Sequence, residues 1–355
     1  MPPCGNFLQG CVKMGLLRLL LASLVAISHM GIDFKGWNVG VGSVVIFYML
    51  AGHVVAKLWA RRPHDRLLPS LGWFYKDRAL RIFPLYLCAL LVSGSLWAMG
   101  TQSHFLSKTP GFAQWVSNLT IIPLNYYMWT GIDRFMLIPP AWSLGAELQF
   151  YLLLPLLMLL PWLGILAAAG SVVVFALAQY EYLNIDIYGY RLLFGVLFIF
   201  LSGVAIEKRS RLGNLALVAL WIALLTYVVV LQMKGIRRPF DHEVAVGYLI
   251  GLPLTIWLSG FRFTGRLNTL QRHAGTLSYG VFVFHFSMIW LLEPYALSSS
   301  ARVGLVLLGS LLLAGAFHYG IERPVWERFR TKLPSQATPS SSKEDSYPRA
   351  MADEK

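Results

Sequence analysis

The chain has 355 residues, of which 56% are hydrophobic and only 13% are charged, and its formal net charge is +13. Soluble domains usually carry about 25% charged residues, so this composition excludes an ordinary soluble enzyme, a disordered chain, a collagen and a coiled coil. The 3 cysteines give no support for a disulfide framework. We therefore expect a helical integral membrane protein. In such a protein, an excess of lysine and arginine is first explained by the positive-inside rule of membrane topology.

The first apolar run follows Lys13 and extends from Gly15 to Ile27, which fits either a secretory signal peptide or a first transmembrane helix. A signal peptide would be followed by a cleavage site of small residues, whereas this run continues directly into Ser28-His29-Met30. The run therefore predicts a transmembrane helix, preceded by a short cytoplasmic segment over residues 1–14.

Continuous apolar runs recur along the chain. A spanning helix needs about 20 mostly apolar residues, whereas a membrane β-barrel would show short alternating segments. The runs predict an all-α, polytopic bundle of about ten membrane-spanning helices, which forms one domain over residues 15–325. The predicted helices are Gly15–Phe34, Asn38–Trp59, Ala79–Met99, Pro139–Leu160, Trp162–Tyr180, Tyr188–Ile206, Leu212–Met233, Glu243–Phe261, Gly275–Glu293 and Arg302–Ile321.

Lysine and arginine are unevenly distributed between the two sides that these helices define. Twenty-one of the 30 fall in the termini and in one set of connections, and seven fall in the other set. The positive-inside rule then places both termini in the cytoplasm. Contact with membrane lipid headgroups explains the basic loops without a nucleic-acid partner. The segment over residues 326–355 is rich in Ser, Pro and charge, which predicts a disordered cytoplasmic tail.

The first predicted helix, Gly15–Phe34, contains Arg18 and His29. Ionisable residues inside membrane helices cost about 2.5–3.5 kcal/mol on insertion scales, so they are candidates for function. Arg18 and His29 are separated by close to three helical turns, which puts them on one face about 16 Å apart along the axis. His29 suits general-base chemistry because an imidazole titrates near neutrality. The alternatives are an Arg18 that extends to the headgroups and a structural His29 bonded to a neighbouring helix.

Two arginines, Arg78 and Arg81, lie three residues apart at the start of the third run and share a helix face. Two guanidinium groups at the inner surface are suited to holding phosphate. The alternative is that they belong to the basic inside loop and serve topology alone.

A polar stripe opens the fourth run, where Ser143, Glu147 and Tyr151 follow an i, i+4, i+8 spacing on one helix face. A carboxylate inside a membrane bundle must be paired or protonated. Glu147 is therefore a candidate for orienting a histidine or binding a hydroxylated acceptor, and the alternative is a structural hydrogen bond between helices.

The last two runs contain two further pairs on nearly one helix face, Ser278 with His285 and His318 with Glu322. Glu322 lies near the predicted inner interface, where Arg323 is able to neutralise it.

Three other polar positions carry less weight. We interpret His53 and Arg191 as structural residues. Asp241-His242-Glu243 lies in an outside connection, and adjacent residues do not converge on a metal without further ligands. We therefore expect no metal site.

Taken in order, these residues resemble the acyltransferase 3 family of bacterial inner-membrane acyltransferases, whose members O-acylate cell-surface glycans. The resemblance extends from Arg18 to Pro324. Five blocks carry it: Arg18 with His29; Phe47-Tyr48-Met49-Leu50-Ala51-Gly52, similar to the family's FFxLSG; Arg78 and Arg81 with Pro84; Trp142-Ser143-Leu144 with Glu147, Phe150 and Tyr151, similar to WSLxxExxFY; and Ser278-Tyr279 with His285, followed by Ile321-Glu322-Arg323-Pro324.

The second block departs from the family pattern. Val45 stands where an acidic residue is frequent, and Ala51 replaces the usual Ser before Gly52. No acceptor contact is therefore assigned to this helix. One subclass of the family carries an extracytoplasmic hydrolase-like domain after the membrane region, and we do not expect that domain in these 355 residues. We expect the membrane domain, or a separate partner, to complete the transfer.

The resemblance implies a multi-pass enzyme of the bacterial inner membrane that moves an acyl group, most often acetyl, from cytoplasmic acetyl-CoA or another acyl-CoA. The implied acceptor is a hydroxyl of a glycan such as an O-antigen, an exopolysaccharide or a lipid-linked sugar. Arg18, Arg78 and Arg81 would hold coenzyme A. His29 would be general base or acyl carrier, with Glu147 setting its tautomer or contacting the acceptor and Glu322 assisting. Supporting or acceptor-contacting residues would be Trp142, Ser143, Tyr151, Ser278, Tyr279 and His285.

The main alternative is a transporter or flippase for a small solute or lipid-linked sugar, because buried His, Arg and Glu also mark proton relays and substrate pathways. The runs show no paired halves with interrupted helices, which would be the usual sign of a transporter. A structural membrane scaffold would leave the five polar blocks unexplained.

Overall fold

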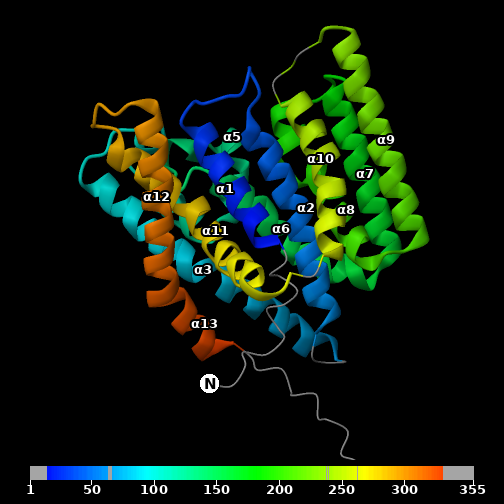
Figure 1. Cartoon of the computed structure of the whole chain (residues 1–355), viewed down its shortest axis with the longest axis horizontal. Helices are drawn as coiled ribbons and strands as arrows, with labels where there is room; N and C mark the ends of the chain where they lie inside the picture. The colour runs from blue at the N-terminus through cyan, green and yellow to red at the C-terminus, as the bar shows by residue number, and fades with distance from the viewer. Residues whose placement is uncertain (1–13, 63–65, 237, 239, 262, 331–355) are drawn as a thin grey trace, which may run out of the picture.

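A computed structural model of the chain describes residues 14–62, 66–236, 238, 240–261 and 263–330, and in this part of the chain it is a bundle of helices with no β-sheet (Figure 1). Nine of the described helical spans are long and apolar enough to cross a membrane. The predicted all-α polytopic bundle is therefore confirmed. The principal helices are α1 (Gly15–His29), α2 (Val39–Ala60), α3 (Leu67–Ala98), α6 (Ala141–Leu159), α7 (Pro161–Gln179), α8 (Leu193–Lys208), α9 (Arg211–Met233), α10 (Asp241–Gly260), α11 (Gly265–Leu292) and α12 (Ser299–Phe317).

Helix α1 is shorter than the sequence predicts and ends at His29 rather than at Phe34. Its 15 residues rise about 22 Å, less than the roughly 30 Å of a bilayer core. The helix stops where Met30 and Gly31 turn the chain, and Gly31 adopts the left-handed region at φ +76° that glycine tolerates. His29 consequently occupies the last turn, where the chain leaves the bundle.

Helices α3 and α11 are longer than predicted, because each begins well before its apolar run. The 32 residues of α3 include Arg78 and Arg81, which therefore lie on a helix and not in a loop. Helix α11 has 28 residues and is continuous, so Ser278 and His285 lie on the same helix. Of these residues, only Arg78 lay outside a predicted helix, whereas Arg81, Ser278 and His285 fell inside the predicted runs Ala79–Met99 and Gly275–Glu293.

The connection from α3 to α6 folds as short helical turns, and it covers one end of the bundle. It contains η3 (His104–Leu106), α4 (Phe112–Thr120), η4 (Ile122–Tyr126), α5 (Tyr127–Thr130) and η5 (Ile132–Phe135). Two fully buried amides hold it in place. Asn118 Nδ2 donates to the Phe135 carbonyl at 3.0 Å, and Asn125 Nδ2 donates to the carbonyls of Trp142 at 3.1 Å and Arg191 at 3.0 Å.

The last described part of the chain continues from α12 through a π-helical turn, η7 (His318–Glu322), into α13 (Arg323–Phe329). The tail predicted over residues 326–355 therefore begins inside a helix. Residues 331–355, and residues 1–13 of the predicted N-terminal segment, lie outside the described part of the chain.

Helices α2 and α8 form the centre of the bundle, whereas α7, α9 and α12 lie at its sides and present apolar side chains outward (Figure 1). The two central helices touch through glycines. A Cβ on Gly52 would overlap the Phe200 carbonyl oxygen, and one on Gly203 would overlap the Met49 carbonyl oxygen. Small residues permit such close approach in membranes, where packing rather than water exclusion joins helices.

Helix α1 packs in the same way on α11. A Cβ on Gly15 would overlap the Gln271 carbonyl oxygen, and the Gln271 side-chain oxygen accepts from Leu16 N at 2.9 Å. The beginning of α1 is thereby fixed on the beginning of α11, which leaves the far end of α1 to meet α11 near His285.

Replacing Gly52 by alanine should weaken the contact between α2 and α8, because overpacking costs about 1–3 kcal/mol. We expect less monodisperse protein and a lower midpoint of thermal unfolding in detergent. Gly94→Ala in α3 is the matched control, because a Cβ there meets no atom within 4 Å. Equal midpoints for the two variants would contradict the contact.

Candidate functional site

A cavity of about 410 Å³ opens where α1 ends, beneath the connection from α3 to α6. The ends of α1, α2, α6 and α11 contribute to its wall, together with the π-helical turn η6 (Ile187–Arg191) and the connection itself. Its size lies in the range of sites for small molecules, which combine an apolar wall with a few directed polar groups. The polar groups therefore define what the cavity can bind.

His29 is exposed to this cavity, and its ring is held by His285 of α11. His29 Nδ1 lies 3.0 Å from His285 Nε2, and His285 Nδ1 lies 3.3 Å from the Val281 carbonyl oxygen. A carbonyl only accepts, so His285 Nδ1 carries the hydrogen and its Nε2 offers a lone pair. His29 Nδ1 then donates to that lone pair, since the reverse would require a buried imidazolium.

The consequence is that His29 Nε2 is left with a lone pair. A neutral imidazole with a fixed tautomer and a basic nitrogen in a cavity can take a proton or attack a carbonyl carbon. Phe286 supports the arrangement, with its ring centroid 5.0 Å from that of His29.

Hydroxyl oxygens line the cavity next to His29. Ser28 donates its proton to the Val25 carbonyl at 2.8 Å, and Ser143 donates to the Pro140 carbonyl at 2.9 Å. Both oxygens therefore present lone pairs to the cavity. The Asn38 side chain accepts from Gly40 N at 3.0 Å and keeps its NH2 group as a donor. This mixture of donors and acceptors matches a ligand that is rich in hydroxyl groups.

Arg191 also lines the cavity, although its place in the sequence favoured a structural role. Its Nε donates to Asp186 Oδ1 at 2.8 Å, and its guanidinium lies 4.6 Å from the centroid of the Trp142 ring. The position could not be recognised from the sequence, because the rings around Arg191 come from segments far apart in the chain. The available signal was an arginine inside an apolar run, preceded by Asp186.

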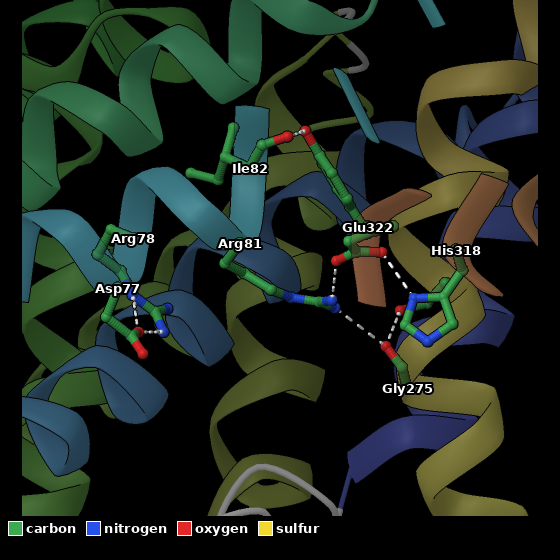
Figure 2. Close-up of polar contacts among 9 residues, drawn as sticks. Asp77, Arg78, Arg81, Ile82, Gly275, His318 and Glu322 are labelled. Carbon is green, nitrogen blue, oxygen red and sulfur yellow. Dashed lines mark hydrogen bonds and ion pairs between the residues drawn. The ribbon is translucent and has the colours of Figure 1, made fainter. Parts of the chain in front are cut away.

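A second group of polar residues lies at the other end of α1, and we call it the arginine cluster: Arg18, Arg78, Arg81, Glu147, Tyr151, Tyr279 and Glu322. Figure 2 shows Arg81 pointing to Glu322, which belongs to η7, and to Gly275, which belongs to α11. Arg81 Nη1 donates to Glu322 Oε1 at 2.6 Å, and His318 Nδ1 donates to Glu322 Oε2 at 2.7 Å.

The Glu322 carboxylate is thus held from both sides, and its side chain is only 4% exposed. The Tyr279 ring centroid lies 5.9 Å from the Arg81 guanidinium, and the Tyr279 hydroxyl donates to the Ile82 carbonyl at 3.1 Å. Ser278 uses its hydroxyl to donate to the Gly275 carbonyl at 3.0 Å. Tyr279 and Ser278 therefore fix the surroundings of the Arg81–Glu322 pair.

The other side of the cluster is centred on Glu147 of α6. Tyr151 donates its hydroxyl to the Glu147 carboxylate, and the Arg78 guanidinium lies 5.8 Å from the Tyr151 ring centroid. Arg78 also donates to Asp77 (Figure 2). The positive charges of Arg18, Arg78 and Arg81 all act on Glu147.

Arg18 differs from the other two arginines. It forms no hydrogen bond or ion pair within the part of the chain that the structure describes, whereas Arg78 and Arg81 each contact a carboxylate. Among the three, Arg18 is therefore the cation whose guanidinium is most available to a phosphate.

The predicted site residues divide into two groups about 16 Å apart, the rise of α1 between Arg18 and His29. The cavity brings together His29, Trp142 and Ser143, and His285 joins this group through its hydrogen bond to His29 without lining the cavity. The arginine cluster contains the rest of the predicted site residues, with Ser278 beside it.

The structure changes the roles predicted for the two glutamates. The tautomer of His29 is set by His285 and not by Glu147, and Glu322 contacts Arg81 and His318 rather than His29.

Comparison with known proteins gives a match to the family model described as an acyltransferase domain, over residues 13–319. A protein of Aquifex aeolicus (strain VF5) described as uncharacterized is 37% identical over 188 residues, 51% of this chain and 83% of that protein. Peptidoglycan O-acetyltransferase OatA of Listeria monocytogenes is 24% identical over 315 residues, 78% of this chain and 49% of OatA.

Acyltransferase MdmB of Streptomyces mycarofaciens is 32% identical over 117 residues, which are 32% of this chain and 27% of MdmB. The match thus spans about half of OatA and about a quarter of MdmB. No solved structure matches the chain.

The Arg81–Glu322 pair yields a stability prediction. Arg81→Gln leaves a buried carboxylate without its guanidinium, which costs about 3–5 kcal/mol. We expect a marked fall in the midpoint of thermal unfolding in detergent, and partial recovery when Glu322→Gln is added. The control is Arg266→Gln, which changes an exposed arginine of α11. A double variant no more stable than Arg81→Gln would contradict the coupling.

Proposed function

This chain belongs to the acyltransferase 3 family and is a multi-pass membrane acyltransferase, and we propose that it O-acylates a glycan with acyl-CoA as the donor. The observation that carries the proposal is the basic nitrogen of His29, which faces a cavity lined by groups complementary to hydroxyls. The positive-inside count favours a cytoplasmic arginine cluster, and we propose the bacterial inner membrane as its location.

Coenzyme A would be held at the arginine cluster. Guanidinium groups bind phosphate through charge-assisted hydrogen bonds, and Arg18 is the one without a carboxylate partner among the described residues. Arg78 and Arg81 would contribute positive charge at the same end of α1, where both already act on Glu147 together with Arg18. The flexible pantetheine arm suits the separation between the cluster and His29.

In the transfer step, the acceptor oxygen forms a bond to the acyl carbon while its proton passes to His29 Nε2. The carbon–sulfur bond then breaks, and the thiolate leaves and takes the proton from His29. The same nitrogen is able to attack the acyl carbon itself and carry the acyl group to the acceptor. Both routes need the lone pair that the His285 hydrogen bond leaves on Nε2.

The choice of acceptor rests on the cavity and on one relative. The lone pairs of Ser28 and Ser143, and the NH2 group of Asn38, offer partners to several hydroxyls of one sugar unit. OatA is named a peptidoglycan O-acetyltransferase, which supports acetyl as the group and a surface glycan as the acceptor. O-antigen, exopolysaccharide and lipid-linked sugars belong to the same chemical class.

The donor is tested with radiolabelled acetyl-CoA and purified protein in detergent. Loss of a charge-assisted hydrogen bond costs about 1.5–3 kcal/mol, so Arg18→Gln should bind acetyl-CoA about ten- to a hundredfold more weakly. Arg266→Gln serves as the control, because Arg266 is an exposed arginine of α11 outside the cluster. Equal affinity of the two variants would contradict coenzyme A binding at the cluster.

The chemistry is tested with His29→Gln, which should lower the rate of acetyl-CoA turnover about 10²- to 10⁴-fold without changing acetyl-CoA affinity. The control is His273→Gln, because His273 is exposed on α11 and contacts Tyr319 away from the cavity. Full turnover by His29→Gln would overturn the assignment of the base. A folded wild-type protein that neither binds nor turns over acetyl-CoA would favour a transporter.

A further inference from the structure

Arg191 of η6 makes contacts on several sides of its guanidinium. Its Nε donates to Asp186, and four aromatic rings surround the guanidinium, with centroids 4.6–5.6 Å from the central carbon. These rings belong to Tyr127, Trp142, Tyr190 and Phe240. Three separate parts of the chain and the arginine's own neighbour therefore fix the plane of one guanidinium. Such stacking holds an arginine in position without using its terminal N–H groups.

Those terminal N–H groups are available to the cavity. The side chain is 15% exposed, it lines the cavity, and its terminal nitrogens make no hydrogen bond among the described residues. The positive charge of Arg191 also acts on the His29 ring. The donors of Arg191 and the basic nitrogen of His29 therefore share one cavity.

The charges around the cavity indicate which kind of ligand the N–H groups of Arg191 would bind. Among the described lining residues, Arg191 is the one with a permanent positive charge, and Asp133 adds a carboxylate that pairs with His104 at 3.4 Å. Asp186 does not line the cavity, but it balances the charge of the guanidinium. A stably anionic ligand would thus meet a cation whose charge is already balanced, together with a carboxylate in the wall. Negative charge that exists only during the reaction is a better match, because fixed donors stabilise it where it develops.

We propose that Arg191 is a catalytic residue whose terminal N–H groups stabilise the oxyanion formed on the acyl carbonyl oxygen; this inference rests on the proposed acyltransfer. As the hydroxyl oxygen bonds the acyl carbon and its proton passes to His29, the carbonyl π pair moves onto oxygen. The oxyanion accepts hydrogen bonds from Arg191. When it collapses, the carbon–sulfur bond breaks and the thiolate takes the proton from His29.

The test uses full-length protein in nanodiscs with acetyl-CoA and water as the acceptor, so that hydrolysis reports the chemistry without an unknown glycan. Removing one oxyanion donor typically costs about 10²–10³ in kcat. We therefore expect Arg191→Ala to lose about 10²–10³ in the kcat of hydrolysis, with the KM for acetyl-CoA changed less. Millimolar guanidinium should restore part of the lost rate, because it returns the missing donors.

Two variants control for structural effects. Arg238→Ala removes another arginine whose Nε pairs with a carboxylate, Glu181 at 3.2 Å, but Arg238 does not line the cavity. Its hydrolysis rate should match wild type and should not respond to guanidinium. Arg191→Ala leaves the Asp186 carboxylate without its partner, which is able to destabilise the protein. The double variant Arg191→Ala/Asp186→Asn removes that negative charge too, so we expect it to fold even if Arg191→Ala alone does not. It should show the same loss of kcat.

The possible results separate the role of Arg191 from the proposed function. An unchanged kcat in both Arg191 variants overturns the oxyanion role. Unchanged hydrolysis together with impaired transfer to chitotetraose also overturns it and assigns Arg191 to acceptor binding. A folded wild-type protein without hydrolysis or transfer instead overturns the proposed acyltransfer.

Discussion

The hydrogen bond between His29 Nδ1 and His285 Nε2 fixes the reactive face of the cavity. It forms because the contacts of Gly15 and Leu16 with Gln271 fix the beginning of α1 on α11, so that the last turn of α1 meets α11 at His285. The Val281 carbonyl decides the tautomer of His285, and His285 decides that of His29. A backbone atom of α11 thus determines which nitrogen of α1 is basic.

Helix α6 connects the two polar groups of the molecule. Ser143 lies in the cavity wall, and the next two turns carry Glu147 and then Tyr151, which contacts Arg78 of the arginine cluster. A donor held by phosphates at the cluster and an acceptor in the cavity would therefore meet along one helix. This arrangement also explains why a membrane helix tolerates costly polar residues at regular spacing.

The sequence predicted the helical bundle well, because continuous apolar runs carry most of the signal for membrane helices. It predicted the end of α1 wrongly, since the apolar character continues past the turn at Gly31. The pairing of Arg81 with Glu322, and of His29 with His285, depends on tertiary packing between distant segments, which no local pattern contains. The role of Arg191 could not be predicted for the same reason, because the four aromatic rings around its guanidinium come together only in the folded protein.

The most direct measurement is an electron cryomicroscopy structure in nanodiscs with a non-hydrolysable acetyl-CoA analogue. We expect the phosphates to contact Arg18 and Arg78, and the acyl carbonyl to lie in the cavity between His29 Nε2 and the terminal nitrogens of Arg191. An analogue bound away from the arginine cluster, or an acyl carbon out of reach of His29, would contradict a transfer reaction that uses the two groups together.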